Sequence, residues 1–311
     1  PRWKLRKITI DIILVKFVTL PHFLLNYIFY CFIGKSFSKI KFIIYRFGVL
    51  NVGTDTIFYK IGILGGSLDE ELCRREKVLT LSGPIASIVL PIQTTKISGR
   101  HAIITKNLSS LSDHRELFES AGEILRIFQS YGTVQIPEFG KFSREIFIGI
   151  EIVGSLFGDN TKQYFLDWIR KFKNKIRFGP SHGDFHQGNI IRDENGKLFL
   201  IDWDCYRDNG IQAIDAFYFI VEFEVQKNNN TYTWIDQLIL FAKSNNYLEQ
   251  YDYFLNEFVD IDYYSLMVLY FLNRIGQELK YQDERPKKPQ KEMEQIINWL
   301  LSNTNCLIPK T

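Results

Sequence analysis

Cysteine is scarce in this chain, and its four copies stand far apart. No two of them form a Cys-x-x-Cys pair, so the sequence indicates neither a structural zinc site nor a disulfide framework. Scattered thiols are typical of a reducing compartment, and we therefore expect a cytoplasmic protein. The four are Cys31, Cys73, Cys205 and Cys306.

Internal repeats and extended low-complexity tracts are also absent, which argues against a repeat architecture. The 311 residues are 46% apolar and 15% aromatic. This length and composition predict a globular protein with a well-packed interior and enough residues for two lobes that share a cleft.

The most informative stretch reads Ser-His-Gly-Asp-Phe-His-Gln-Gly-Asn at 181–189, and Ile-Asp-Trp-Asp follows at 201–204. Between them, two apolar runs flank an Asn-Gly pair. That pattern predicts a β-hairpin whose two central residues both have positive φ. The hairpin should place Asn189 just before one strand and Asp202 just after its partner, close together.

The side chains of this stretch suit the transfer of a phosphoryl group. Asn189 and Asp202 offer oxygen ligands, which Mg²⁺ prefers and supplements with the phosphates of its substrate. Asp184 lies in a loop, where it can orient an attacking alcohol and accept its proton late in the transfer. Positioning and charge neutralisation do most of the catalysis in such reactions, so an ordinary carboxylate is adequate.

The pattern His-Gly-Asp-x-His-x-x-Gly-Asn followed by Ile-Asp-Trp-Asp resembles the catalytic signature of aminoglycoside phosphotransferases and choline kinases, which are small-molecule relatives of the protein kinases. The resemblance implies that Asp184 is the catalytic residue, that His182 braces its loop, and that Asn189 and Asp202 are metal ligands. ATP and Mg²⁺ are the implied cofactors. His186 and Asp204 match the small-molecule branch better than the protein kinases.

The same resemblance implies an α+β, protein-kinase-like fold of two lobes. A small lobe of antiparallel strands with one helix is expected at 45–108, and a larger, mainly helical lobe at 109–311. Residues 1–44 are expected to form a basic, apolar, helical N-terminal segment.

Family order also predicts an ion pair that holds the ATP phosphates. Lys60 lies inside the strand pattern 56–62, and Glu76 lies in the helical pattern that Ser67 opens after a glycine-rich break. Two plainer interpretations stay open: Lys60 as a charge that protects a sheet edge, and Glu76 as one of several solvated helix charges.

No G-x-G-x-x-G loop is present to cover the phosphates. Residues 45–52 and 56–61 are predicted as two strands, with Gly53 as the single glycine of their turn. The strand 101–105 then leads to the expected connection between the lobes, where Thr105 and Asn107 would bind adenine; an ordinary strand end is the alternative.

Protein-kinase features are missing after the metal motif. Only residues 205–211 separate Asp204 from the apolar helix predicted at 212–224, and no A-P-E motif ends a peptide-docking segment. We therefore expect a small-molecule or glycan hydroxyl as the acceptor.

Asp215, in the helix predicted at 212–224, resembles the family's structural Asp. Amphipathic helices are also predicted at 161–176, as core, and at 291–301.

Positive charge is missing from residues 247–264, which hold five acidic residues and no Lys or Arg. In relatives, acidic helices of this lobe can bind cationic acceptors such as aminoglycosides or choline. A solvated acidic face is the other interpretation, and the sequence favours it.

Residues 1–46 have the opposite bias. They hold nine Lys or Arg against one acid, which gives a net charge of +8. The whole chain has a net charge of +3, so the other 265 residues have a net charge of −5. Residues 17–34 contain no charged residue apart from a histidine. Three interpretations stay open: peripheral contact with an anionic membrane, packing on the kinase lobe, and a membrane span. No nucleic-acid-binding motif accompanies this basic patch.

The sequence thus predicts an ATP-dependent phosphotransferase that phosphorylates a hydroxyl of a small molecule, with a sugar or glycolipid head group favoured. An aminoglycoside-type antibiotic kinase and a catalytically silent, nucleotide-binding pseudokinase scaffold are the alternatives.

Overall fold

The computed structural model describes residues 40–46, 49–54, 57–62, 68–97, 100–106, 108, 111, 113–228, 233–243, 248–278 and 290–302. Internal contacts divide the chain into two compact units. Unit 1 comprises Pro1–Ser109 and Ile191–Asp204, and unit 2 comprises Ser110–Ile190 and Cys205–Thr311.

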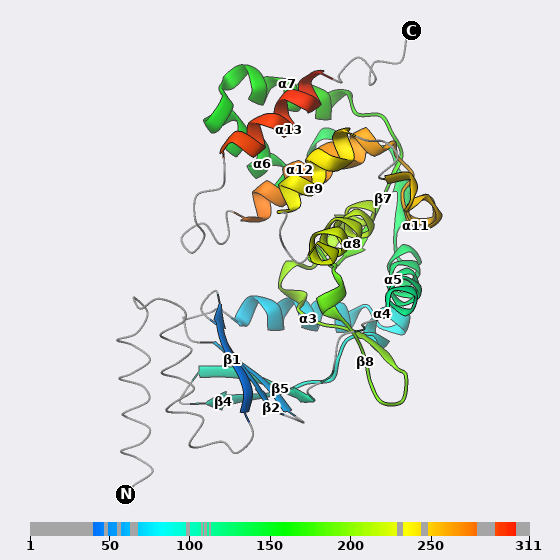
Figure 1. The fold of residues 1–311 in the computed structure, drawn as a ribbon. Helices are drawn as coiled ribbons and strands as arrows, with labels where there is room; N and C mark the ends of the chain where they lie inside the picture. The colour runs from blue at the N-terminus through cyan, green and yellow to red at the C-terminus, as the bar shows by residue number, and fades with distance from the viewer. Residues whose placement is uncertain are drawn as a thin grey trace, which may run out of the picture. The chain divides into compact units, whose positions relative to one another are not determined.

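Unit 1 is built on a five-stranded antiparallel sheet with the strand order β1-β2-β3-β5-β4 (Figure 1). Strands that are consecutive in the chain pair with one exception: β5 lies between β3 and β4. The strands are β1 Ile40–Arg46, β2 Val49–Thr54, β3 Ile57–Gly62, β4 Gln93–Ile97 and β5 Arg100–Lys106.

The first strands differ from the prediction. Residues 45–52, expected as one strand, belong to β1 and β2, and residues 40–44, expected as helical, are the start of β1. Gly53 lies within β2 and pairs with Phe58 rather than forming the turn. Gly48, which stands between the two strands in the sequence, was the available signal that 45–52 is not one strand.

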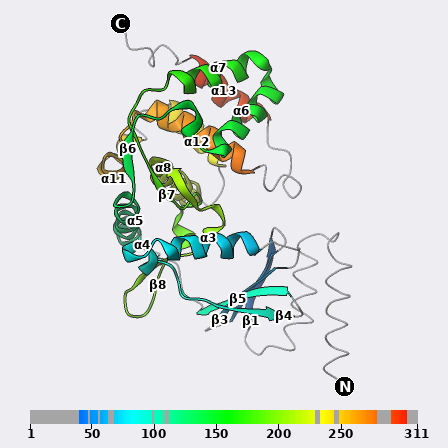
Figure 2. The same cartoon turned by 180° about the vertical axis from the view of Figure 1, so that it is seen from behind.

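Helix α3 (Asp69–Thr80) packs on this sheet through Leu72, which joins Leu68 and the strand residues Val49 and Ile103 in one apolar cluster. Figure 2 shows α3 and the short α4 (Gly83–Ser87) from behind. The helix begins with three acidic residues, which favour a helix N-terminus through the macrodipole.

The predicted hairpin is confirmed as β8 (Ile190–Arg192) and β9 (Leu198–Leu200). Leu200 N donates to Ile88 O at 2.7 Å, which ties β9 to the segment after α4 within unit 1. The turn is not the expected one: Gly196 has φ +79°, but Asn195 does not have a positive φ. Asp193 Oδ1 instead accepts from Asn195 N and Lys197 N and shapes a longer turn.

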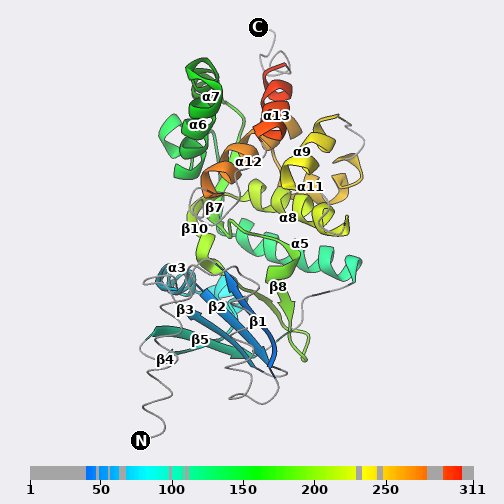
Figure 3. The same ribbon diagram turned by 60° about the vertical axis from the view of Figure 1, so that its left-hand side comes forward.

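Unit 2 is mainly helical, and α8 (Gln212–Lys227) lies at its centre between α5 and α12 (Figure 3). Its other helices are α5 His114–Gln129, α6 Arg144–Phe157, α7 Asp159–Lys171, α9 Trp234–Lys243, α11 Asp252–Phe258, α12 Tyr263–Glu278 and α13 Gln290–Ser302. A three-stranded antiparallel sheet, β10-β7-β6, is formed by β6 Thr133–Gln135, β7 Ile176–Ser181 and β10 Arg207–Ile211.

Helices α6 and α12 pack at close range because glycines lie at their contact. A Cβ added to Gly149 would come within 2.0 Å of Leu272 O, and one added to Gly276 within 1.8 Å of Glu145 O. Only glycine allows the two backbones to approach this closely. The contact fixes α12, which carries residues described below.

The helices predicted at 212–224 and 291–301 are confirmed as α8 and α13. For the helix predicted at 161–176, the prediction that its apolar side chains lie in the core is confirmed, since Phe165, Trp168 and Ile169 are buried. Its end is wrong, because α7 stops at Lys171 and Ile176 opens β7. The apolar Ile176 fits the spacing of a helix and also a buried strand. It lies in a strand because β7 pairs with β6.

The expectations for residues 1–39 lie outside the described residues. Among the residues that the structure describes, no helix combines the length and the apolar character needed to cross a membrane.

Candidate active site

Lys60 is the centre of the polar cluster in unit 1. It lies in β3, opposite Ile103 of β5, and its side chain is largely buried. Its Nζ lies 2.6 Å from Glu71 Oε2 and 2.7 Å from Asp202 Oδ1. Lys60 was predicted to form an ion pair, and in the structure two carboxylates contact its ammonium group.

The predicted partner of Lys60 was wrong. Glu76 is exposed, whereas Glu71 on the same helix is buried and forms the ion pair. Five residues of a helix turn a side chain through about 140°, so the two glutamates cannot face the sheet together. Burial of Val78 and Leu68 points Glu71 toward the sheet.

The two carboxylates compete for one ammonium. Burial opposes the charge of Lys60, but Asp202 and Glu71 outweigh it and raise the pKa of the ammonium above its usual value. Burial also raises the pKa of Glu71 to about 7; Lys60 offsets part of this effect, and the charge of Asp202 adds to it. A cation that drew Asp202 away would leave Glu71 as the undivided partner of Lys60.

Asp202 has an unusual backbone conformation. Its φ is +66°, in the left-handed region that side-chain-bearing residues seldom occupy. Such strain concentrates at functional sites, where the surrounding structure holds it in place. Here Trp203 Nε1 donates to Leu200 O at 3.0 Å and closes the turn around Asp202.

In unit 2, Asp215 of α8 holds the loop 182–186 through hydrogen bonds to its backbone. Its carboxylate accepts from His182 N at 2.6 Å and from Gly183 N at 2.8 Å. Burial raises the pKa of Asp215 to about 7, although the two backbone donors favour its charged form. Asp215 was expected to have a structural role, and these two hydrogen bonds show how it holds the loop.

Gly183 allows this loop its shape. Its φ is +78°, and a Cβ at this position would lie 2.4 Å from Cys205 O. The imidazole of His182 is fully buried and lies edge-on to Phe185 at 6.3 Å. His182 therefore belongs to the support of the loop, and the structure gives it no exposed atom for chemistry.

The loop presents Asp184 between two helices of unit 2. Tyr218 Oη of α8 donates to Asp184 Oδ1 at 2.5 Å. Arg274 of α12 lies 3.8 Å from the same oxygen, with its guanidinium 4.7 Å from the centre of the Tyr218 ring. His186 Nε2 lies 3.7 Å from the other carboxylate oxygen.

These neighbours keep Asp184 ionised. Burial opposes its charge, but the contacts with His186, Arg274 and Tyr218 outweigh burial and hold the pKa of Asp184 well below its usual value. A carboxylate in this state accepts hydrogen bonds only, so it can orient a hydroxyl that donates to it.

Asn189 is positioned by the same loop. Its Nδ2 donates to Asp184 O at 2.9 Å and lies 3.4 Å from Asp184 Oδ2. The amide nitrogen is thereby engaged, and the amide oxygen is the atom with which Asn189 can bind a cation.

Of the residues predicted to bind adenine, Thr105 lies in β5 and its Oγ1 donates to Pro91 O at 3.3 Å. Asn107 lies outside the described residues. The acidic residues of 247–264 are partly engaged within the protein: Glu257 pairs with Arg126, and Asp262 accepts from Ser265.

Sequence reasoning missed Tyr218 and Arg274. No motif connects either position with the loop 182–186. The available signal was an arginine inside the strongly apolar pattern of α12, where a charged residue is uncommon unless it is paired.

Residues 94–220 match the model of the family described as phosphotransferase enzymes. The match spans the loop 181–189, the 202–204 motif and Asp215, and it confirms the resemblance that the sequence indicated.

Two known proteins illustrate the relationship. The chain is 27% identical over 142 residues to the RIO-type serine/threonine-protein kinase Rio2 of Methanocaldococcus jannaschii, covering 42% of this chain and 47% of that protein. The chain therefore spans less than half the length of this curated relative. The choline kinase LicA of Streptococcus pneumoniae has a similar structure, with a TM-score of 0.50, 13% identity and coverage of 89% of this chain and 99% of that one.

The similarity to LicA establishes the fold. The expected α+β, protein-kinase-like class, with a small antiparallel sheet and a larger helical part, is confirmed. The family match of residues 94–220 supports a phosphotransferase.

Proposed function

We propose that this phosphotransferase moves the γ-phosphoryl group of ATP to a hydroxyl of a small molecule. The observation that carries the proposal is Asp184: an ionised carboxylate, held by Tyr218 and Arg274, in a loop of the family-matched segment. It orients the acceptor hydroxyl and takes its proton as the bond to phosphorus forms.

Lys60 would steady the ATP phosphates, with Glu71 as the partner that keeps it in place. Asn189 and Asp202 would hold Mg²⁺. Their oxygen atoms suit a hard cation, and Mg²⁺ typically takes only one or two protein carboxylates alongside phosphate oxygens. When bound, Mg²⁺ neutralises the charge of the phosphates during transfer.

The short connection before α8 supports a small acceptor. Within unit 2, residues 205–211 lead directly through β10 into α8, and β10 is paired with β7. No peptide-docking segment lies in this stretch, in contrast to the protein kinases.

A sugar or glycolipid head group is the acceptor we favour. The basic, apolar residues 1–46 support it, because they also suit contact with an anionic membrane surface. Flotation with anionic liposomes, comparing the full chain with one lacking residues 1–39, tests that contact.

The test of the function is transfer of labelled γ-phosphate from ATP to a panel of sugars, glycolipids, choline and aminoglycosides, with and without Mg²⁺. We expect a labelled, Mg²⁺-dependent product with at least one alcohol. Nucleotide binding without transfer to any of them would favour the pseudokinase scaffold instead. Transfer confined to aminoglycosides would assign the antibiotic kinase.

Glu71→Gln tests the corrected ion pair. A charge-assisted hydrogen bond contributes roughly 1.5–3 kcal/mol, so its loss should lower kcat/KM for ATP by about ten- to a hundredfold. Glu76→Gln is the matched control on the same helix and should leave kcat/KM unchanged. Steady-state kinetics against ATP decide the matter; a loss in Glu76→Gln with none in Glu71→Gln would restore the original pairing.

A further inference from the structure

We propose that His186 is a positioning residue: its imidazole holds the carboxylate of Asp184 in the orientation that the acceptor hydroxyl requires. The inference rests on the proposed function, in which Asp184 takes the proton of the acceptor. It gives a role to a histidine of the loop to which the sequence motif alone assigned none.

One ring nitrogen of His186 is engaged by the backbone. Gly188 N, two residues along the chain, donates to His186 Nδ1 at 3.0 Å. A nitrogen that accepts a hydrogen bond has no proton of its own, and the neutral ring then holds its proton on the other nitrogen. This hydrogen bond therefore assigns the proton to Nε2 and makes that atom a donor.

Nε2 of His186 faces the carboxylate of Asp184. It lies 3.7 Å from Oδ2, which is farther than a direct hydrogen bond, so the N–H and the charged oxygen attract each other across a longer contact. Asn189 Nδ2 lies 3.4 Å from the same oxygen. Oδ1 is held by Tyr218, whose hydroxyl donates to it at 2.5 Å. Donors at both oxygens restrict the rotation of the carboxylate group.

The loop leaves room for the imidazole. A Cβ added to Gly188 would lie 2.9 Å from Cε1 and 3.1 Å from Nδ1 of the His186 ring. Gly188 does not have a positive φ, so glycine is needed here for space rather than for conformation. The ring also stacks on that of Tyr218, with centres 6.4 Å apart and planes at 28°. These neighbours limit the positions that the imidazole can take.

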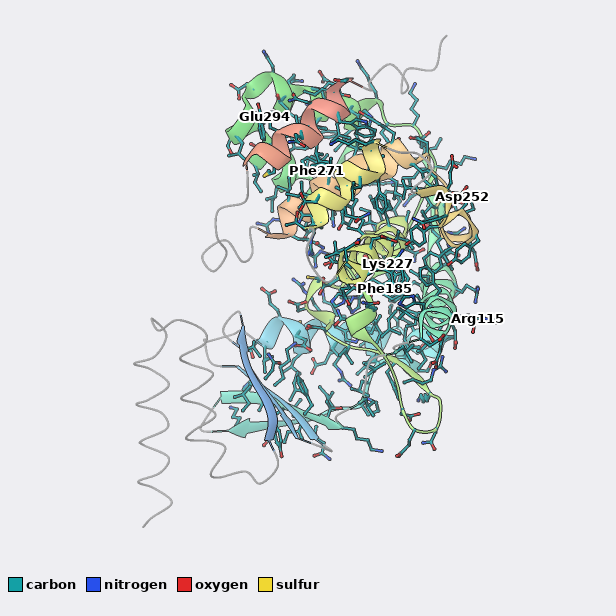
Figure 4. All side chains as sticks on the ribbon, in the orientation of Figure 1. Arg115, Phe185, Lys227, Asp252, Phe271 and Glu294 are labelled. Carbon is teal, nitrogen blue, oxygen red and sulfur yellow. The ribbon has the colours of Figure 1, made fainter. Side chains whose placement is uncertain are left out.

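Phe185 anchors the chain between the two polar residues. Its side chain, labelled in Figure 4, is fully buried, and its ring lies 5.9 Å from that of Phe219 in α8. Because this side chain is packed in the core, the backbone that carries Asp184 and His186 on either side of it has little freedom. Their contact is therefore part of the packed structure of the loop.

A simpler role for His186 is structural. It is the N-cap of the short 3-10 helix η2 (Gln187–Asn189), and the capping contact is the hydrogen bond from Gly188 N to Nδ1. Such a role explains Nδ1 but gives no reason for Nε2 to face Asp184. A positioning role explains both contacts, because phosphoryl transfer depends mainly on how its groups are placed.

Two substitutions separate these roles, because each keeps one contact of the ring. His186→Asn has an oxygen that can accept from Gly188 N, as in an Asx turn, but no donor that reaches Asp184. His186→Gln has an amide N–H about as far from the backbone as Nε2, but no acceptor in the position of Nδ1. His114→Asn, at the exposed histidine that begins α5, is the matched control in the same unit.

We expect His186→Asn to lower kcat by about tenfold while KM for ATP stays unchanged, since a misplaced catalytic group slows transfer without weakening nucleotide binding. His186→Gln should transfer phosphate about fivefold faster than His186→Asn, because it restores a donor to Asp184. His114→Asn should match the unaltered protein. Equal rates for the two variants at position 186, or faster transfer by His186→Asn, would make the cap the whole role of His186 and overturn the inference.

Heteronuclear NMR of the imidazole nitrogens gives a second readout, which does not depend on turnover. The resonances that are absent from His186→Asn identify the ring. We expect the proton on Nε2, and we expect Asp184→Asn to shift the Nε2 resonance while Asp167→Asn leaves it in place. A proton on Nδ1, or an Nε2 resonance that ignores Asp184→Asn, would contradict the assigned contact and overturn the inference.

Failure of the proposed function has a different signature. If the unaltered protein transferred phosphate to none of the acceptors, the proposed reaction would be removed, and the NMR result alone would decide whether His186 holds Asp184. Intact transfer by the unaltered protein with the wrong order of the two variants would remove only the role of His186.

Discussion

Asp184→Asn should lower the rate of phosphoryl transfer by about a thousandfold, within the range that general-base groups contribute. The amide retains an oxygen that accepts from Tyr218, so the loop keeps its support from α8. The lost function is acceptance of the acceptor's proton, since an amide is not a base. Nucleotide affinity should stay unchanged, because the ATP phosphates are assigned to Lys60.

The matched control is Asp167→Asn, which neutralises a half-buried aspartate of α7 in the same unit. Labelled γ-phosphate transfer, nucleotide titration and thermal denaturation together separate chemistry from binding and folding. Transfer at the original rate by Asp184→Asn would remove Asp184 from the chemistry, and the kinase mechanism with it.

The loop before β8 and the β8–β9 hairpin could be predicted because their signals are local. An Asn-Gly pair between two apolar runs strongly indicates a hairpin. The polar residues of the motif 181–189 are close in sequence, so their loop could be recognised without knowledge of the tertiary structure. Even so, the turn differs in detail, since Asp193 rather than a positive φ at Asn195 shapes it.

The lysine's partner could not be chosen from the sequence. At 100° per residue, Leu68, Leu72 and Leu79 form a stripe on α3, and Glu71 and Glu76 lie on opposite sides of it at similar angles. Packing on the sheet decides between them: Val78 is buried and Leu79 is exposed, which turns the helix so that Glu71 faces Lys60.

The support of Asp184 was unpredictable for another reason. Tyr218 and Arg274 come from α8 and α12, separated from the loop by 34 residues and by 90, and only the tertiary contact of these helices unites them. The close approach of α6 and α12 through glycines shows how specific that packing is. Sequence patterns indicate which residues are buried, but not which polar side chains meet inside.

Asp202 offers the sharpest test of the metal assignment because its backbone limits the useful substitutions. At φ +66°, alanine would add strain of its own, whereas asparagine tolerates the left-handed region. Asp202→Asn also keeps an oxygen that can accept from Lys60. The fold should therefore survive, and only the negative charge is lost.

We expect Asp202→Asn to transfer phosphate at least about a hundredfold more slowly at a fixed Mg²⁺ concentration, because the metal supplies several kcal/mol of charge stabilisation. Its requirement for Mg²⁺ should rise in a titration. Asp69→Asn, in the exposed first turn of α3, is the control and should keep the original Mg²⁺ dependence. If Asp202→Asn titrated with Mg²⁺ like the unaltered protein, its contact with Lys60 would be its whole role, and the metal ligands would have to be sought elsewhere.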